Sequence, residues 1–393
     1  MELGKGYKVT EVGTIPVDWQ LKNIATTSTI KARIGWQGLT TSEYLSIGDY
    51  FLVTGTDFFD GKIKWETCYY VNKDRFIQDK NIQVKVGDIL ITKDGTIGKV
   101  AYVDVLPLDA TLNSGVFVVR PKDNSYDPLY CFYIFNSEYF DEFLRKLVAG
   151  STINHLYQKD FVLFNFPLPP TKAEQTAIAS ALSDADALIS SLEKLIEKKR
   201  NIKQGAMQEL LKPKKGWVVK RVEDIAQVGR GRVISHKEIA LSLQNTFPVY
   251  SSQTTNNGIM GYIDTFDFDG EYVTWTTDGE NAGTVFYRIG KFNCTNVCGT
   301  IRVKADNARF IAFLLNSVTS NYVSKNLANP KLMNDPMKKI EIAIPQKEEQ
   351  DRIANVIMEM ENEVILLEKK LSKSKMIKQG MMQELLTGKI RLV

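Results

Sequence analysis

The chain contains PTKAEQTAIASAL at residues 170–182 and PQKEEQDRIANVI at residues 345–357. It also contains IKQGAMQELL at residues 202–211 and IKQGMMQELL at residues 377–386. In each pair, the second copy begins 175 residues after the first. The whole segment from 170 to 211 therefore aligns with the segment from 345 to 386 without a gap. Self-similarity at a fixed offset indicates that one structural unit occurs twice in the chain.

Apolar residues recur within each copy at alternating steps of four and three residues, which is the spacing of a coiled-coil seam. This spacing predicts one long helix per copy, and the gapless match predicts that the two seams pack against each other. Packing of each helix on its own domain is the alternative. The predicted core residues are Ile178, Leu182, Ala185, Ile189, Leu192 and Ile196 in the first copy, and Ile353, Ile357, Met360, Val364, Leu367 and Leu371 in the second.

The ends of the two helices carry sequence signals. A proline lies just before each helix, and Thr171 with Glu174 has the T-x-x-E spacing of a capping box. Pro213 is expected to stop the first helix, because proline cannot continue a helical hydrogen-bond ladder. Gly388 is placed to end the second helix.

A segment of mixed pattern precedes each helix. Runs of β-branched and aromatic residues predict strands at 88–92, 116–120, 271–276 and 300–303, with helical stretches at 130–147 and 308–326. The sequence thus predicts an α+β chain, in which two mixed α/β domains are separated by two long antiparallel coiled-coil helices in a pseudo-twofold tandem repeat. The predicted boundaries are 1–169 for the first domain, 170–212 for the central helix, 213–344 for the second domain and 345–393 for the C-terminal helix and tail.

The two domains resemble each other weakly, but in the same order. The segment from Ile91 reads ITKDGTIGKVAY, and the segment from Trp275 reads WTTDGENAGTVFY. In both, a strand runs into Asp-Gly, turns, passes Gly98 or Gly283 and returns as a strand. The helices have stayed alike while the domains have diverged, which is the pattern expected of two related domains that bind two different ligands.

Composition limits the class of protein. The net charge of +4 permits a nucleic-acid partner only if positive charge is clustered. Four cysteines and two histidines argue against a structural zinc site, and we expect buried free thiols. The N-terminus carries Glu2 and lacks an apolar h-region, and no apolar run approaches the ~20 residues of a membrane span, so a cytoplasmic protein is predicted.

Known catalytic motifs are missing from the sequence. GTIGK at residues 95–99 is too short for a phosphate loop and lacks its Ser/Thr, so it is interpreted as a β-turn. G-x-S-x-G, H-E-x-x-H and the N-P-P-aromatic signature of adenine methyltransferases do not occur. Asp184 and Asp186 lie on the predicted helix and are expected to be solvated. The sequence therefore predicts a binding protein with no catalytic residue, metal site or cofactor of its own.

Loop-like stretches are rich in the side chains that read DNA base edges. Such clusters recur in both domains near the matching turns. Together they support DNA binding more strongly than any single residue does. The candidate DNA-binding residues are Lys31, Arg33, Trp36, Lys93, Asp94, Thr96, Ser151, Thr152, Asn154 and His155 in the first domain, and Arg230, Arg232, Ser252, Gln253, Thr254, Asn256, Asn257, Thr277, Asp278, Asn281, Lys331 and Asn334 in the second.

Basic runs lie on or beside the helices, at residues 198–200, 212–215 and 369–375. A solvated coiled-coil face is the simpler interpretation. Contact with phosphates or docking of a partner protein is the alternative.

Several motifs along the chain, from TIPVDWQLKNI near its start to MQELLTGKIRLV at its end, together resemble the specificity subunits of type I restriction–modification enzymes, and the resemblance covers essentially the full chain. The most specific element is P-x-x-x-E-Q-x-x-I-A, which occurs twice. The second domain departs from the pattern, since ANPKLMN at residues 328–334 replaces the AGST stretch of the first. The motifs are TIPVDWQLKNI, GDILITKDGTIGKVAY, TLNSGVFVVRP, AGSTINHLYQKDF, PLPPTKAEQTAIA and MQELLTGKIRLV.

The resemblance implies a division of labour. Each domain would be a target-recognition domain that binds one half of a bipartite, asymmetric site in double-stranded DNA. The helices would fix the spacer and dock two modification subunits, which bind S-adenosylmethionine and methylate adenine. Restriction subunits that use ATP and magnesium would complete the nuclease, and no membrane would be involved.

Two other functions are compatible with the sequence. The chain could be a coiled-coil scaffold whose domains bind proteins or glycans, in which case competitor DNA and salt would not affect binding. It could also be a self-sufficient enzyme, in which case the purified chain alone would transfer methyl groups or cut DNA.

Overall fold

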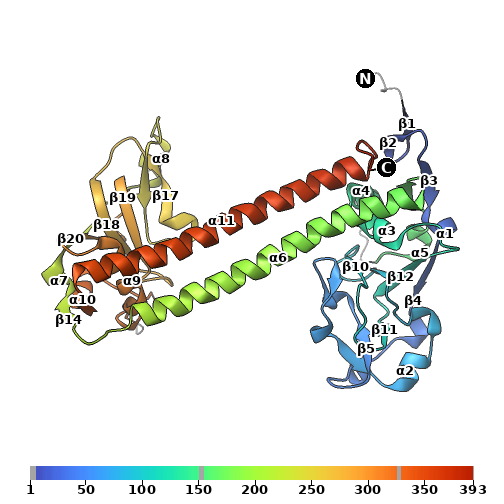
Figure 1. Ribbon diagram of the computed structural model, residues 1–393, viewed down its shortest axis with the longest axis horizontal. Helices are drawn as coiled ribbons and strands as arrows, with labels where there is room; N and C mark the ends of the chain where they lie inside the picture. Colours follow the sequence, from blue (N-terminus) through green and yellow to red (C-terminus); the bar gives the residue numbers. More distant parts are fainter. Residues whose placement is uncertain (1–5, 150–154, 325–328, 393) are drawn as a thin grey trace. The chain divides into compact units, whose positions relative to one another are not determined.

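The computed structural model describes residues 6–149, 155–324 and 329–392 of the chain. The chain divides into two compact units (Figure 1). Unit 1 holds residues 1–192 and 370–393, and unit 2 holds residues 193–369. The central and C-terminal helices therefore each contribute turns to both units.

Unit 1 is built on a four-stranded antiparallel sheet of order β10-β9-β12-β4. Three-stranded and two-stranded sheets surround it. Three of its strands are β4 (Ser28–Ala32), β9 (Ile89–Thr92) and β12 (Val116–Pro121), and the last two confirm predicted strands. The other strands are β1 (Tyr7–Thr10), β2 (Gly13–Pro16), β3 (Gln20–Asn23), β5 (Tyr50–Val53), β6 (Phe58–Phe59), β7 (Lys62–Ile63), β8 (Tyr69–Val71), β10 (Val100–Tyr102), β11 (Ala110–Leu112) and β13 (Asn165–Leu168).

The predicted helical stretch at 130–147 is wrong as a single helix. It consists of α3 (Pro128–Phe135) and α4 (Glu138–Ala149). The break lies at Ser137, whose hydroxyl donates to the Ile134 carbonyl oxygen at 2.7 Å, so the side chain competes with the helical ladder. The short helices of unit 1 are α1 (Ile24–Thr27), α2 (Lys73–Ile77) and α5 (Gln158–Phe161).

Unit 2 is built on a six-stranded sheet of order β15-β20-β18-β19-β16-β17, in which only the β16–β19 pair is parallel. Strands β18 (Phe268–Thr276) and β20 (Cys298–Val303) confirm the two predicted strands. The other strands are β14 (Val218–Arg221), β15 (Ala226–Arg230), β16 (Phe247–Tyr250), β17 (Ile259–Ile263), β19 (Val285–Cys294) and β21 (Glu341–Ile344), and the short helices are α7 (Val222–Ile225), α8 (His236–Ala240) and α10 (Asn334–Lys338).

Helix α9 (Ala308–Val318) is shorter than the stretch 308–326 that the sequence predicts. A 3₁₀ turn follows at Thr319–Asn321, and residues 325–326 lie outside the described residues. The buried Thr319 hydroxyl donates to the Gly283 carbonyl oxygen at 2.7 Å, which ties the end of the helix to the turn between β18 and β19.

The two sheets share one frame. The order β10-β9-β12-β4 in unit 1 has its counterpart in the order β19-β18-β20-β15 in unit 2. A helix follows the sheet in each case, α3 or α9, and the last short strand of the domain pairs with an early one, as β13–β3 or β21–β14. The internal duplication inferred from the sequence is therefore present in the strand order.

The two long helices are α6 (Lys172–Leu210) and α11 (Lys347–Leu385), as the seam predicts. In unit 2, Lys199, Arg200 and Lys203 of α6 pair with Glu363, Glu368 and Glu361 of α11 at 2.7, 2.6 and 3.2 Å. In unit 1, Lys378 Nζ lies 2.5 Å from Asp186, so this carboxylate is not merely solvated. From the pair of Lys203 and Glu361 to the pair of Asp186 and Lys378, the α6 number falls while the α11 number rises, which confirms an antiparallel pair.

The predicted seam residues differ in how deeply they are buried and in what buries them. Ile189, Leu192, Ile196 and Val364 are buried, whereas Ala185, Met360, Leu367 and Leu371 are half-buried. The first turns of each helix are buried in part by the domain. Ile178 and Leu182 lie in one core with Tyr130 and with Leu385 of α11. Ile353 and Ile357 lie in the core of unit 2. At these turns, each long helix therefore packs both on the other long helix and on its own domain.

A buried glutamine fixes each long helix to the domain before it. The Gln175 side chain accepts from the Asp127 backbone N–H at 2.8 Å and donates to the Pro169 carbonyl oxygen at 3.0 Å. Gln350 repeats this in unit 2 with Asn307 and Pro345, both at 2.9 Å. Asp127 and Asn307 are the N-caps of α3 and α9. The glutamine of the repeated E-Q motif thus joins three elements in each unit.

The expected capping box is only half formed. The Glu174 backbone N–H donates to the Thr171 hydroxyl at 3.2 Å, but the Glu174 side chain does not return to the cap. This buried carboxylate instead accepts from Arg391, which also reaches Asp18 at 2.9 and 3.1 Å. The second helix ends as expected, since Gly388 has a φ of 69°.

We predict that Gln350→Leu lowers the free energy of unfolding by about 2–4 kcal/mol, because it leaves the half-buried Asn307 N–H and the buried Pro345 carbonyl group without their partner. Urea denaturation followed by circular dichroism measures the change. The exposed Gln346 supplies the control, and Gln346→Leu should change stability by less than about 1 kcal/mol. Equal effects of the two substitutions would contradict a role for the buried amide.

A second prediction concerns the seam. Ile196→Asp should lower the free energy of unfolding by roughly 3 kcal/mol or more, because it places a carboxylate where 5% of the side chain is exposed. The neighbouring Leu195 is 38% exposed, so Leu195→Asp should cost less than about 1 kcal/mol. Thermal unfolding by calorimetry compares the two variants, and similar melting temperatures would show that the seam is not a core.

Candidate nucleic-acid interface

One buried threonine organises the Asp-Gly turn in each domain. Thr92 ends β9, and its hydroxyl accepts from the Lys99 backbone N–H at 2.9 Å. Thr276 ends β18 and accepts from the Thr284 N–H at 3.0 Å. The predicted β-turn at GTIGK is thus confirmed, and its counterpart in unit 2 is one residue longer.

The glycines of these turns face neighbouring side chains. Gly98 has a φ of 80°, and a Cβ there would lie 2.3 Å from Leu144 of α4. Gly283 has a φ of 89°, and a Cβ there would lie 2.9 Å from Val323. Left-handed backbone and close packing both require glycine at these positions.

A second segment crosses the turn in each domain. In unit 1, Asp94 bridges to His155, and the Leu156 N–H donates to the Lys93 carbonyl oxygen at 2.8 Å. In unit 2, Asp278 bridges to Lys331, and the Leu332 N–H donates to the Thr277 carbonyl oxygen at 2.8 Å. His155 and Lys331 therefore occupy equivalent positions, although the local sequences do not align.

The candidates of unit 1 gather in part at this crossing. The Asp94 carboxylate contacts His155 Nδ1, and the His155 ring lies 4.5 Å from the Tyr157 ring between centroids. Lys93 Nζ lies 5.4 Å from the centre of the Phe117 ring. Thr96 is exposed in the same turn, and Lys31 is exposed on β4. This surface combines an imidazole, a carboxylate and an ammonium group.

Arg33 does not fit the predicted DNA contact. The side chain is 2% exposed, and it donates to the Leu112 carbonyl oxygen at 2.9 Å, to Thr111 at 3.1 Å and to Gln78 at 3.1 Å. Burial lowers the pKa of its guanidinium. The basic residue that the sequence assigns to a surface thus holds the edge of the sheet together.

A third segment joins the crossing in unit 2. The Ser252 hydroxyl donates to Asp278 at 2.8 Å. Gln253 donates to the Ile259 carbonyl oxygen, and Asn256 and Asn257 both have a positive φ. The polar loop at residues 251–258 therefore lies against the Asp-Gly turn. The remaining candidates of this loop and turn, Thr254 and Asn281, are half-buried and exposed, respectively.

Arg230 and Arg232 differ in whether carboxylates already pair with their guanidinium groups. Arg232 pairs with Glu238 at 2.6 Å and with Asp267 at 3.0 Å, and its hydrogen bonds to Glu238 raise its pKa. Arg230 is half-buried at the end of β15, where its Nη2 lies 3.5 Å from Met333 Sδ beside the half-buried Asn334. Of these two arginines, Arg232 is held in ion pairs, whereas Arg230 makes none with the residues that the structure describes.

Some candidates stay untested by the geometry. Ser151, Thr152 and Asn154 lie outside the described residues, and so does the side chain of Trp36. The four cysteines are buried free thiols, as predicted, and the Sγ atoms of Cys294 and Cys298 lie 3.3 Å apart.

Sequence reasoning missed the residues that position the turns. Thr92 and Thr276 are visible as a shared T-x-D-G pattern, so aligning the two domains could have identified them. Arg288 gives no such signal, because it lies within β19 among alternating polar and apolar residues. Its side chain is 4% exposed and contacts the loop at residues 251–258.

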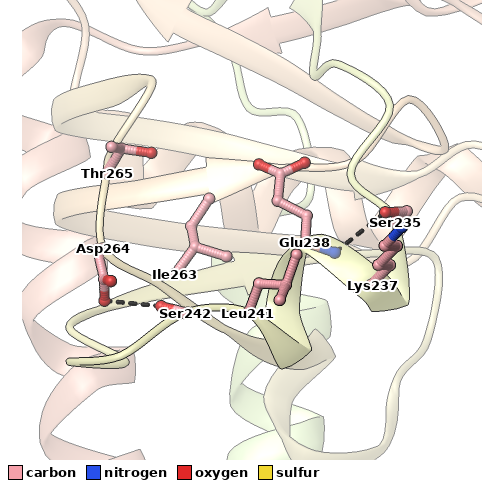
Figure 2. Close-up of a pocket in the computed structure, with 8 residues that line it drawn as sticks. All are labelled: Ser235, Lys237, Glu238, Leu241, Ser242, Ile263, Asp264 and Thr265. Atoms are coloured by element: carbon pink, nitrogen blue, oxygen red, sulfur yellow. Dashed lines mark hydrogen bonds between the residues drawn. The ribbon is translucent and has the colours of Figure 1, made fainter.

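A shallow pocket of about 390 Å³ lies beside α8, lined by residues of α8 and of the segment 263–265 (Figure 2). Asp264 accepts from the Ser242 hydroxyl at 2.7 Å and from the backbone N–H groups of Leu243, Gln244 and Asn245 at 2.9–3.0 Å. These bonds, the Ser242 bond first, lower the pKa of Asp264. The carboxylate therefore organises a loop, and this contribution is present at neutral pH and is lost as the pH falls through the lowered pKa.

Comparison with known families decides the class. The model of the type I restriction modification DNA specificity domain matches residues 38–204 and 214–374, which is most of the chain. The chain belongs to this type I specificity family. Two matches in one chain agree with the duplicated frame of the two units.

Relatives in Mycoplasma pneumoniae match a part of this type I specificity chain. A putative type I specificity subunit N-terminus is 45% identical over 139 residues, which cover 35% of this chain and 74% of the relative. The specificity subunit of the type I restriction enzyme MpnII is 42% identical over 143 residues, which cover 36% of this chain and 43% of that relative. The chain thus spans less than half the length of the MpnII relative.

Solved structures share the fold over nearly the whole chain. The crystal structure of a type I restriction–modification S subunit from M. genitalium has a TM-score of 0.63 at 16% identity and covers 98% of both chains. A structure from work on assembly and conformational transition of a type I system has a TM-score of 0.58 at 14% identity, with 96% of this chain covered and 99% of the other. In the part of the chain that the structure describes, no helix is long and apolar enough to cross a bilayer.

We predict that Asp264→Ala loosens the loop at residues 242–245, because four hydrogen bonds to the carboxylate are lost. Hydrogen–deuterium exchange should show faster exchange of the Leu243, Gln244 and Asn245 amides. Asp269→Ala, at an exposed position on β18, serves as the control and should leave these amides unchanged. Unaltered exchange in Asp264→Ala would show that the loop is held by other contacts.

Proposed function

We propose that each domain of this specificity subunit binds one half of a bipartite, asymmetric site in double-stranded DNA. Family membership supports DNA recognition as the general role. The finer assignment rests on one observation, which is that the same turn and crossing segment occur in both domains with different side chains. His155 stands in the first domain where Lys331 stands in the second.

A shared frame with different side chains suits two unlike half-sites. The first surface carries Lys93, Asp94 and His155, whereas the second carries Ser252, Asp278 and Lys331. Amide, hydroxyl and basic groups can read donor and acceptor patterns in the major groove. Lysines would mainly contact phosphates and so fix the position of each domain on the duplex.

The long helices would set the spacer between half-sites and dock the modification subunits. A helix has a fixed rise of about 1.5 Å per residue, so it holds a defined length better than a flexible linker does. The helices also carry exposed apolar side chains that the seam does not use, which supports docking of a partner. These are Leu188, Leu195 and Ile202 on α6, and Ile365, Leu366, Met376 and Ile377 on α11.

Chemistry would belong to the partners. Two modification subunits would bind S-adenosylmethionine and methylate adenine, and restriction subunits would use ATP and magnesium. This chain would contribute recognition and positioning, and no catalytic group.

The test uses the full chain co-expressed with its modification subunits. Methylation sequencing of a genome that carries the system gives the target, and fluorescence anisotropy then measures affinity for that duplex at several salt concentrations. We expect Lys93→Ala and Lys331→Ala each to weaken binding and to reduce the slope of log affinity against log salt by about 1. The cause is the loss of one phosphate contact.

Lys220→Ala is the control, because Lys220 lies exposed on β14 and belongs to neither surface. It should leave affinity and slope unchanged. A wild-type complex that shows no sequence preference would refute the proposed function. An effect of Lys220→Ala as large as that of Lys331→Ala would refute the assigned surface.

A further inference from the structure

Arg288 is a buried cation in the middle of the unit 2 sheet. It lies on β19, and 4% of the residue is exposed. The guanidinium carbon lies 3.7 Å from the centre of the Tyr250 ring and 4.4 Å from the centre of the Phe286 ring. Two aromatic faces therefore enclose the charged group.

The guanidinium joins the sheet to the polar loop. Its Nη2 donates to the Asn257 carbonyl oxygen at 2.8 Å, and its Nε donates to the Thr274 hydroxyl at 3.3 Å. Thr274 lies on the neighbouring strand β18, whereas Asn257 lies in the loop at residues 251–258. One planar group thus links two strands to a loop that carries five of the candidate residues.

Burying the Arg288 guanidinium costs free energy of folding that fold stability by itself does not explain. Within the described residues, Arg288 makes no ion pair with a carboxylate. Burial lowers the pKa of its guanidinium despite the opposing attraction of Tyr250. Cation–π contacts offset part of the desolvation, but an apolar side chain of similar size would fill the same space without burying a charge.

The loop needs an external restraint. Asn256, Asn257 and Gly258 have φ values of 48°, 51° and 80°, so three consecutive residues are left-handed. Asparagine tolerates this conformation better than other side chains do, but a run of three such residues is uncommon and is favoured where surrounding contacts stabilise it. A Cβ on Gly258 would lie 3.0 Å from Arg288 Nη2, so the absent side chain leaves room for the guanidinium.

We propose that Arg288 is a positioning residue that determines the DNA specificity of the second domain, by holding the loop at residues 251–258 in its left-handed conformation. The inference rests on the proposed function, since it takes this loop to face DNA. Arg288 acts through Asn257 and the side chains next to it, and it does not itself contact a base.

Loss of this restraint should affect discrimination more than general affinity. Hydrogen bonds to base edges weaken steeply when a donor moves away from its acceptor by a few tenths of an ångström or tilts. Phosphate contacts made by flexible lysines tolerate such shifts and carry no sequence information. A displaced loop would therefore leave a complex that still binds DNA but selects its second half-site poorly.

The experiment uses the full chain assembled with its modification subunits and a duplex library in which both half-sites are randomised. Binding selection followed by sequencing gives a base preference at each position of each half-site. Arg288→Met should reduce discrimination on the order of tenfold at one or more positions of one half-site only. Preferences in the other half-site should stay as in the wild-type complex.

Two further variants separate positioning from a general structural effect. Arg288→Lys keeps a cation between the rings and a donor for Asn257, so it should restore part of the lost discrimination. Arg302→Met removes an exposed arginine whose guanidinium carbon lies 5.9 Å from the Tyr272 ring centre, and should change no preference. Thermal unfolding of all three variants verifies that they fold.

The outcomes are distinct. A wild-type complex that selects no bipartite motif overturns the proposed function itself. A wild-type complex with a clear motif, together with an Arg288→Met complex of the same motif, overturns the role of Arg288 alone. Equal loss at both half-sites, or a loss that Arg288→Lys does not relieve in any part, also overturns it, because a general destabilisation would act in that way.

Discussion

The buried amides of Gln175 and Gln350 are the interaction on which the other features depend. Each side-chain amide accepts from a backbone N–H at the start of one helix and donates to the carbonyl oxygen of the proline before another. A helix that slid by one residue would leave these groups unpaired, at about 1–3 kcal/mol for each. The long helices are therefore fixed in register to their own domains, and sequence changes in the surface loops leave this register unchanged.

The two domains show how one frame can carry unlike surfaces. Thr92 and Thr276 close equivalent turns from inside the sheet, where they are buried. The residues that vary, such as His155 and Lys331, lie outside this framework and contact the turn from another segment. The side chains that hold these loops in place are thus different from those that differ between the two domains.

The two long helices and the central strands of each sheet were predictable because their signals are local or repeated. The seam spacing, Pro213 and Gly388 predicted both helices to within a few residues, and the Asp-Gly pairs predicted the turns. The candidate site was harder to predict, because contacts between residues far apart in the sequence form it. The equivalence of His155 and Lys331 depends on a bridge across the turn, and the local sequences do not align. The sequence predicts a DNA contact for Arg33 and gives no signal for Arg288, yet both side chains are buried among hydrogen-bond partners and, for Arg288, aromatic rings.

The unequal length of the two turns has an evolutionary consequence. The second turn accommodates one more residue than the first, while threonine, glycine and strand order stay the same. An extra residue at this point leaves the strand pairing and the buried threonine in place, so it should not destabilise the fold as most changes to a core do. The sequence of these turns can therefore change over evolutionary time without first requiring spare stability elsewhere in the domain.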